Sequence, residues 1–188
     1  RTGIRRAVTR LELFRVLLVG FMGSGKTSVG RDLAGRLGWR FVDFDEAIEV
    51  EEGRSVASIF AAEGEPYFRE VEERVANDLL SERCAVLASG GGWAVAPGRL
   101  AAVPKGTATF WLRVSAEKAL ERGSHELDRR PLLEQRDALD GTRQLLIERV
   151  PHYQKAQWTV DTEHSAVEDV SAQIFKILTG KYTRAAGE

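Results

Sequence analysis

The sequence predicts a single α/β domain in three layers, with a five-stranded parallel sheet covered by helices on both faces. Short apolar runs, which are typical of buried strands, alternate along the chain with segments whose apolar residues recur at helical spacing. A glycine-rich loop, a carboxylate pair and a glycine triplet each follow one of these runs. Because ligands of such sheets bind at the carboxyl ends of the strands, we expect the three features to form one site.

The composition excludes several classes of protein. The chain has 188 residues, 43% of them hydrophobic, which suits one globular domain with its own core. Its 27 basic and 28 acidic residues give a net charge of −1 and offer no support for general binding to nucleic acids or membrane surfaces. No apolar stretch approaches the ~18 residues of a membrane span, and no secretory signal is visible. Since the single cysteine, Cys84, cannot form an internal disulfide, we expect a cytoplasmic protein.

The most informative motif is a phosphate-binding loop. The apolar run Val16–Val19 leads into residues 20–27, which match the pattern G-x-x-x-x-G-K-[ST] between a strand and a helix. Its glycines let backbone N–H groups face inward around phosphate oxygens, and the helix dipole favours anions at the same place. In this motif Lys26 reaches the β- and γ-phosphates, and the Thr27 hydroxyl suits Mg²⁺. An ordinary glycine-rich turn would match by chance in about one such chain in 150.

The other elements follow from periodicity and from stop signals. Gly38 and Gly53 are typical helix ends, Ser55 and Ser115 are typical N-caps, and a turn is expected at 63–66. The expected helices cover residues 27–37, 46–52, a short segment after Ser55, 67–80, a brief segment near 97–102, 115–122, 136–157 and 166–178. The expected strands, after the first, cover residues 39–45, 84–88, 107–114 and 158–160.

Two further strand ends carry groups suited to a ligand. Asp43 and Asp45 are spaced i, i+2, which on a strand places both carboxylates on one face beside the phosphate loop. Helix capping by Asp45 would explain one aspartate but not the pair, so we favour a functional site. Gly90–Gly92 follow the strand at 84–88 and indicate a backbone that approaches a ligand closely, because a flexible turn rarely needs three glycines.

Arginines supply the remaining candidates. Arg69 lies near the start of the helix expected at 67–80, where a cation opposes the helix dipole, which hints at another function. A solvated arginine paired with a nearby glutamate remains open as the alternative. The polar segment 123–136 contains Arg129 and Arg130. Long loops in compact domains are usually functional or disordered, and an arginine-bearing lid that closes over a nucleotide fits phosphoryl transfer.

Taken in order, these motifs closely resemble the shikimate kinase family. The resemblance covers residues 14–178 and rests on GFMGSGKT at 20–27, FVDFDxxIE at 41–49, SIF at 58–60, GExxFRxxE at 64–72, the glycine triplet, RPLL at 130–133 and RxxxY at 149–153. It implies a P-loop kinase fold similar to nucleoside monophosphate kinases. It also implies ATP-dependent phosphorylation of the 3-hydroxyl of shikimate, in aromatic amino-acid (chorismate) biosynthesis, by a monomer that binds neither nucleic acid nor membranes.

The resemblance also implies a domain organisation and a role for each matching residue. A kinase domain at 13–180, with a substrate subdomain near 45–75 and a lid near 123–136, would lie between a flexible segment at 1–12 and a tail at 181–188. Asp45 would hold the shikimate hydroxyls and act as the candidate base, while Arg130 in the lid would reach the transferred phosphate. The other implied ligands are Gly23, Ser24, Gly25, Lys26, Thr27 and Ser28 for the ATP phosphates, Thr27 and Asp43 for Mg²⁺, Arg122 and the loop after Asp161 for adenine, and Arg69, Arg149, Gly91 and Gly92 for shikimate.

Two departures from the family pattern and two alternative functions remain at this point. Trp93 follows the triplet where the family usually has a small side chain, so we expect the indole near the bound substrate. Two adjacent arginines in the lid leave open which one enters the site. Another small-metabolite kinase, such as a gluconate or nucleotide kinase, is the nearest rival, and a non-catalytic nucleotide-binding regulator is the second. Loss of Lys26 or Asp45 would indicate a regulator, and both are present.

Overall fold

The first apolar run forms the central strand of the sheet. The structure is a computed structural model that describes residues 11–127 and 135–184. Strand β2 (Arg15–Val19) has five buried residues and lies in a five-stranded sheet of order β3-β4-β2-β5-β6. All four pairings in this sheet are parallel, as predicted. The other strands are β3 (Arg40–Asp43), β4 (Ala85–Ala88), β5 (Thr107–Arg113) and β6 (Trp158–Asp161).

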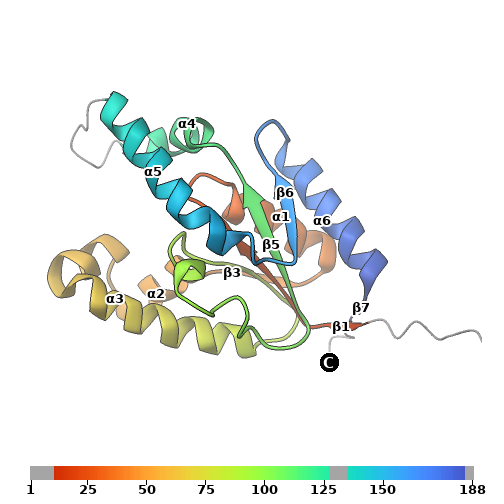
Figure 1. Ribbon diagram of the computed structural model, residues 1–188. Coiled ribbons are helices and arrows are strands. Elements are labelled where there is room, and N and C mark those ends of the chain that lie inside the picture. The colour runs from red at the N-terminus through yellow and green to blue at the C-terminus, as the bar shows by residue number, and fades with distance from the viewer. Residues whose placement is uncertain (1–10, 128–134, 185–188) are drawn as a thin grey trace, which may run out of the picture.

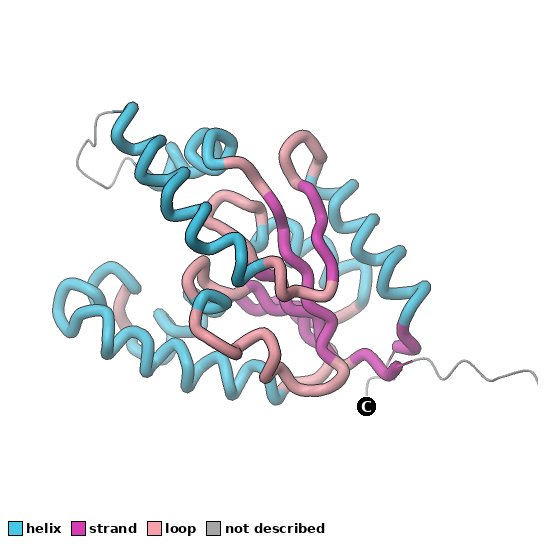
Figure 2. The backbone as a smooth tube through the Cα atoms, in the orientation of Figure 1, coloured by secondary structure: helices cyan, strands magenta, loops and turns pink. Residues whose placement is uncertain are grey.

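Helices cover both faces of the sheet, as Figures 1 and 2 show. Val16 and Leu18 of β2 belong to a hydrophobic cluster with residues of α1 (Lys26–Leu37) and α6 (Val167–Lys181). Leu17 and Val19 point to the other face and belong to a cluster with residues of α3 (Val56–Ser81) and α5 (Gln135–Tyr153). A strand buried on both faces reads as a continuous apolar run, which is why its pattern lacks alternation. The predicted three-layer α/β fold is confirmed.

Several element boundaries differ from the sequence prediction. The turn expected at 63–66 is a kink inside α3, where Gly64 has φ 79° and ψ 178°. The helix expected near 97–102 is wrong, because the short 3-10 helix η1 (Trp93–Val95) precedes it and turns follow. Helix α4 (Ala116–Leu127) runs further than predicted, and α5 begins at Gln135. Residues 128–134 of the predicted lid, including Arg129 and Arg130, lie outside the described residues.

A second, small sheet joins the two ends of the described chain. Strand β1 (Leu11–Leu13) pairs in parallel with β7 (Tyr182–Arg184), which directly follows α6. The sequence placed residues 11–12 and 182–184 in terminal segments, because three-residue strands are too short to show a period. The pairing of β1 with β7 therefore extends beyond residues 13 and 180, the two limits predicted for the domain. Among the helices that the structure describes, none combines the length and apolar character needed to cross a membrane.

Candidate active site

The phosphate loop fits between β5 and α4 because it contains glycine at the close contacts. Gly20, Gly23 and Gly25 have φ values of 147°, 68° and 87°, which favour glycine. A Cβ on Gly20 would lie 2.6 Å from the carbonyl oxygen of Leu112, and one on Gly23 would lie 2.6 Å from that of Ala119. The contacts with β5 and α4 therefore fix the shape of the loop. Helix α1 begins directly after Gly25.

Polar groups of the loop are arranged for an anion. Lys26 Nζ donates to the carbonyl oxygens of Gly20 (3.0 Å) and Phe21 (2.9 Å), so its ammonium group lies over the loop. The side-chain hydroxyl of Ser24 is buried and has no hydrogen-bond partner among the described residues. Ser28 lies one residue further along α1 than Thr27 and is exposed. An ammonium group, an unsatisfied hydroxyl and a helix N-terminus together suit phosphate oxygens.

Asp43 connects the loop to the next helix. Its Oδ2 accepts a hydrogen bond from Thr27 Oγ1 at 2.8 Å, and its Oδ1 accepts from the backbone N–H of Asp45 at 3.0 Å. The sequence expected both aspartates on one strand face, which is wrong, because β3 ends at Asp43 and Asp45 lies in the first turn of α2 (Phe44–Glu52). Asp43, rather than Asp45, caps the helix. The pair still meets beside the phosphate loop, by capping instead of by strand alternation.

The donors beside the loop fit Mg²⁺. A hydroxyl and a carboxylate oxygen lie 2.8 Å apart at Thr27 and Asp43, and both are hard oxygen donors. No group of three or more His, Cys, Asp or Glu in the described part of the chain could hold a metal ion by itself. Mg²⁺ is usually held by one or two carboxylates together with substrate phosphates and waters, so this sparse donor set suits it.

The carboxyl group of Asp45 has an unusual environment. Its pKa is raised to about 6, mainly by burial and in smaller part by the neighbouring carboxylates of Asp43 and Glu72, while Lys26 opposes the shift. A Cβ on Gly90 would lie 2.9 Å from Asp45 Oδ1 and 3.1 Å from Glu72 Oε1. The first glycine of the triplet thus leaves room for two carboxyl groups, one of them with a pKa close to neutral pH.

Arg69 and Arg149 lie around the other two glycines. Arg149 Nη1 donates to the carbonyl oxygen of Gly91 at 3.2 Å, and the buried Tyr153 hydroxyl donates to the same oxygen at 2.5 Å. A Cβ on Gly92 would lie 2.9 Å from both terminal nitrogens of Arg69. Both arginines line one pocket of about 410 Å³. The fold therefore brings together two cations from α3 and α5 that are far apart in the sequence.

Arg69 also has carboxylate partners on its own helix. Its Nη1 lies 2.8 Å from Glu72 Oε2, and its Nη2 lies 2.9 Å from Glu65 Oε1. The side chain of Glu72 is 1% exposed and that of Glu65 is 64% exposed. Arg69 is therefore paired with glutamates, as the alternative interpretation expected, and it also lines the pocket. The sequence analysis assigned no role to Glu72 or Tyr153, although the spacings Arg69-x-x-Glu72 and Arg149-x-x-x-Tyr153 place each pair on one helix face.

Arg122 connects the phosphate loop to the loop after β6. Its Nη2 donates to the carbonyl oxygen of Thr162 at 2.6 Å, and its Nη1 donates to that of Gly23 at 3.3 Å. The segment expected beside adenine thus lies next to the phosphate loop. Trp93 differs from its prediction, because its indole is 3% exposed, packs edge-on against Phe44 at 5.6 Å, and does not line the pocket of Arg69 and Arg149.

Fold and site together define a class of protein. A parallel sheet with a P-loop after its central strand, an acidic residue against the loop and an adjacent pocket with two arginines are the parts of a P-loop phosphotransferase that acts on a small anion. The shikimate kinase family model matches residues 22–179. The chain belongs to the shikimate kinase family.

Individual relatives agree with this assignment. The shikimate kinase of Moorella thermoacetica is 41% identical over 163 residues, which cover 87% of this chain and 93% of that protein. The structure of the shikimate kinase from Acinetobacter baumannii in complex with shikimate has a TM-score of 0.80 and 37% identity, covering 89% of this chain and 94% of that one. For the Aquifex aeolicus enzyme the TM-score is 0.74 and the identity 34%, covering 88% and 96%.

Proposed function

We propose that this chain transfers the γ-phosphoryl group of ATP to the 3-hydroxyl of shikimate, giving shikimate 3-phosphate and ADP in aromatic amino-acid biosynthesis. The observation that carries the proposal is the convergence of Arg69 and Arg149 on one pocket. Shikimate is a small carboxylate with several hydroxyls, and two guanidinium groups match a carboxylate through paired hydrogen bonds. Asp45 lies against Gly90 at the same triplet and would accept hydrogen bonds from the hydroxyls.

The phosphate loop supplies the positioning that phosphoryl transfer needs. Lys26 moves from the carbonyl oxygens that it now contacts to the β- and γ-phosphates, where charge develops in the transition state. Thr27 and Asp43 would hold Mg²⁺, with Asp43 acting through water, and the ion supplies neutralisation of phosphate charge. Asp45 takes the proton from the attacking hydroxyl, a task for which a pKa of about 6 is well suited.

The rest of the proposed organisation follows the family resemblance. The kinase domain spans about residues 13–180, with the substrate subdomain near 45–75 and the lid near 123–136. Arg130 closes over the transferred phosphate, and Arg122 flanks adenine together with the loop after Asp161. The protein acts as a cytoplasmic monomer. A gluconate kinase also has a phosphate loop, and gluconate is likewise a carboxylate with several hydroxyls, so the match to the shikimate kinase family, and not the arginine pair alone, favours shikimate as the acceptor.

Turnover with a panel of acceptors tests this proposal. ATP-to-ADP conversion is measured with shikimate, gluconate, AMP and CMP, and we expect shikimate to be strongly preferred. A second comparison uses a shikimate analogue in which a neutral amide replaces the carboxylate. The wild type should prefer the acid, and Arg69→Ala should lose most of that preference. Equal discrimination by both proteins would show that Arg69 does not bind the carboxylate.

A matched control exists on the same helix. Arg74 of α3 is exposed and pairs with the exposed Glu51 at 2.6 Å and, more distantly, with Glu52 at 3.5 Å. Arg74→Ala removes one positive charge from α3 without touching the pocket, and exposed ion pairs contribute little to stability. This variant should keep the preference of the wild type for the acid. A loss equal to that of Arg69→Ala would mean that the general charge of the surface, and not the pocket, attracts the substrate.

A further inference from the structure

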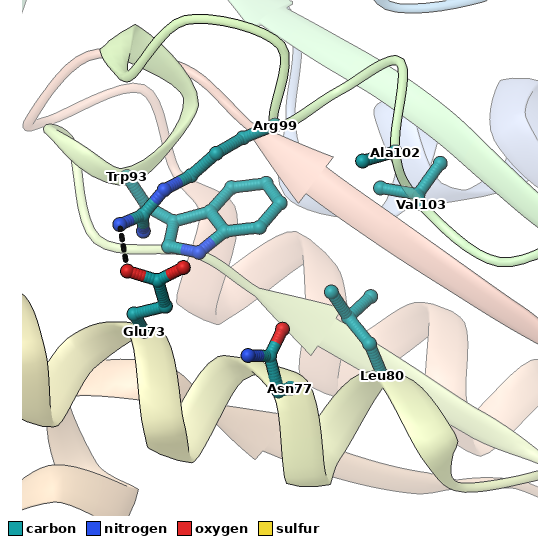
Figure 3. A pocket seen from close by; sticks show the side chains of 7 residues that line it. All are labelled: Glu73, Asn77, Leu80, Trp93, Arg99, Ala102 and Val103. Atoms are coloured by element: carbon teal, nitrogen blue, oxygen red, sulfur yellow. Dashed lines mark ion pairs between the residues drawn. The ribbon is translucent and has the colours of Figure 1, made fainter.

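A second pocket lies beside the glycine triplet, away from the groups assigned to catalysis. Its volume is about 110 Å³, and its lining includes Trp93, Arg99, Glu73 and Asn77. Figure 3 shows the guanidinium group of Arg99 reaching across the indole of Trp93 toward α3. Trp93 is the residue that departs from the family pattern, and Arg99 has no function in the site described above. The proposed phosphoryl transfer therefore gives no role to the pair of Trp93 and Arg99.

Arg99 is held against the carboxylate that orients Arg69. Its Nη1 lies 3.7 Å from Glu72 Oε2, the same oxygen that lies 2.8 Å from Arg69 Nη1. Its Nη2 lies 3.6 Å from Glu73 Oε2. The guanidinium carbon lies 5.7 Å from the centre of the Trp93 ring, and the side chain is 16% exposed. One buried carboxylate oxygen of Glu72 is thus shared by two guanidinium groups.

Trp93 keeps Arg99 in this position. The indole is buried and packs edge-on against Phe44, the first residue of α2. An aromatic face that cannot move offers a fixed site for a cation. Arg99 Nη1 is buried and has no hydrogen-bond partner among the described residues, so its position depends on charge and stacking and not on a directed hydrogen bond.

We propose that Arg99 is a positioning residue for Arg69, acting through Glu72. A buried carboxylate needs a cation nearby, because burial removes the water that would stabilise its charge. If Arg69 were the only cation beside Glu72, the substrate carboxylate would have to compete with Glu72 for it. Arg99 supplies the second positive charge, which leaves Arg69 free to donate into the pocket. Glu65 is exposed and lines the same pocket, so a substrate oxygen can readily replace it as the partner of Arg69.

The test replaces Arg99 by methionine, which keeps an unbranched side chain against Trp93 and removes the charge. We expect the KM for shikimate to rise about tenfold or more, which is the fold-change of one lost charge-assisted contact. The KM for ATP should stay within about twofold, because the side chain of Arg99 contacts Glu72, Glu73 and Trp93. Arg99→Met should also lose most of the preference for shikimate over its amide analogue, whereas Arg99→Lys should recover part of it.

Glu73→Gln is the matched control. The side chain of Glu73 is 65% exposed, so this substitution removes the exposed partner of Arg99 and leaves Glu72 untouched. Its KM for shikimate should equal that of the wild type within about twofold. An Arg99→Met protein with an unchanged KM for shikimate, or with equal increases for shikimate and ATP, would overturn the proposal. So would a Glu73→Gln protein as impaired as Arg99→Met.

A double variant keeps the proposal testable if Arg99→Met alone does not fold. Glu72→Gln removes the buried charge that Arg99 compensates, so Arg99→Met should add no further increase in KM on that background. A full additional increase would mean that Arg99 acts elsewhere, which contradicts the proposal. The inference rests on the proposed function, and turnover of shikimate by the wild type tests that function separately.

Discussion

Replacement of Asp45 by asparagine should stabilise the unliganded protein while it reduces catalysis. Burial, assisted by Asp43 and Glu72, raises the pKa of Asp45 from 3.8 to about 6. A group whose charged form is disfavoured in the folded state opposes folding wherever it is ionised. Two pKa units at about 1.4 kcal/mol each give about 3 kcal/mol of lost stability at pH values above the folded pKa. Asparagine has nearly the same shape and no charge, so Asp45→Asn should recover this free energy of unfolding.

The pH dependence gives the sign of the effect. Below the unfolded pKa of 3.8 the carboxyl is protonated in both states, so the wild type and Asp45→Asn should be equally stable. As the pH rises through about 6 the wild type loses stability and the variant does not. Urea unfolding of both proteins at about pH 4 to 8, with a chelator and no nucleotide, measures the difference. The same substitution removes the proposed base and should lower kcat by about a hundredfold or more.

Asp43→Ala is the control with the opposite sign. Asp43 accepts hydrogen bonds from Thr27 Oγ1 and from the N–H of Asp45, so its removal leaves the first turn of α2 without its cap. Loss of an N-cap costs about 0.5–2 kcal/mol. The two aspartates, two positions apart, should therefore change stability in opposite directions. A stability of Asp45→Asn that follows the wild type at every pH would refute the explanation by burial and neighbouring carboxylates.

Three further predictions concern the phosphate loop and the lid. Lys26→Ala should abolish phosphoryl transfer and keep a normal circular dichroism spectrum, because the ammonium group serves phosphate and not the core; near-normal turnover would contradict the assignment. Gly23→Ala should lower the unfolding free energy by about 1–3 kcal/mol, since its φ is 68° and the new Cβ would meet backbone at 2.6 Å. Gly35→Ala, in an open helical position, should instead be neutral or stabilising. Arg130→Ala should lower kcat far more than Arg129→Ala, and the reverse ranking would show that Arg129 enters the site.

The strand, glycine-rich loop and helix of the phosphate-binding motif could be predicted from the sequence because their signals are local. The motif has a fixed spacing, and the flanking strand and helix are visible as periodicity, whereas the close approach of Gly20 to Leu112 and of Gly23 to Ala119 is visible only in the structure. The carboxylate pair was predicted for a partly wrong reason. Strand alternation and helix capping both bring Asp43 and Asp45 to the loop, and only the position of the strand end distinguishes the two.

Contacts between distant segments could not be read from the sequence. The three-residue strands β1 and β7 carry no period, so their pairing depends on where the chain ends meet. The position of Trp93 depends on the space beside Phe44, and Arg99 shows no local signal at all. An arginine on a loop could contact solvent, a glutamate or a ligand with equal ease, and sequence spacing does not distinguish these outcomes.

The sequence by itself determined the layered α/β fold, the phosphate loop and, through ordered motifs, the family. Through the family resemblance it also implied that Arg69 and Arg149 share one ligand. Only the tertiary structure decided that Gly90 leaves room for both Asp45 and Glu72, and that Glu72 lies between two guanidinium groups. The physical reason is the range of the interactions. Backbone angles and apolar periodicity act over a few residues, whereas charge, burial and the fit of a substrate depend on segments that meet only when the sheet has formed.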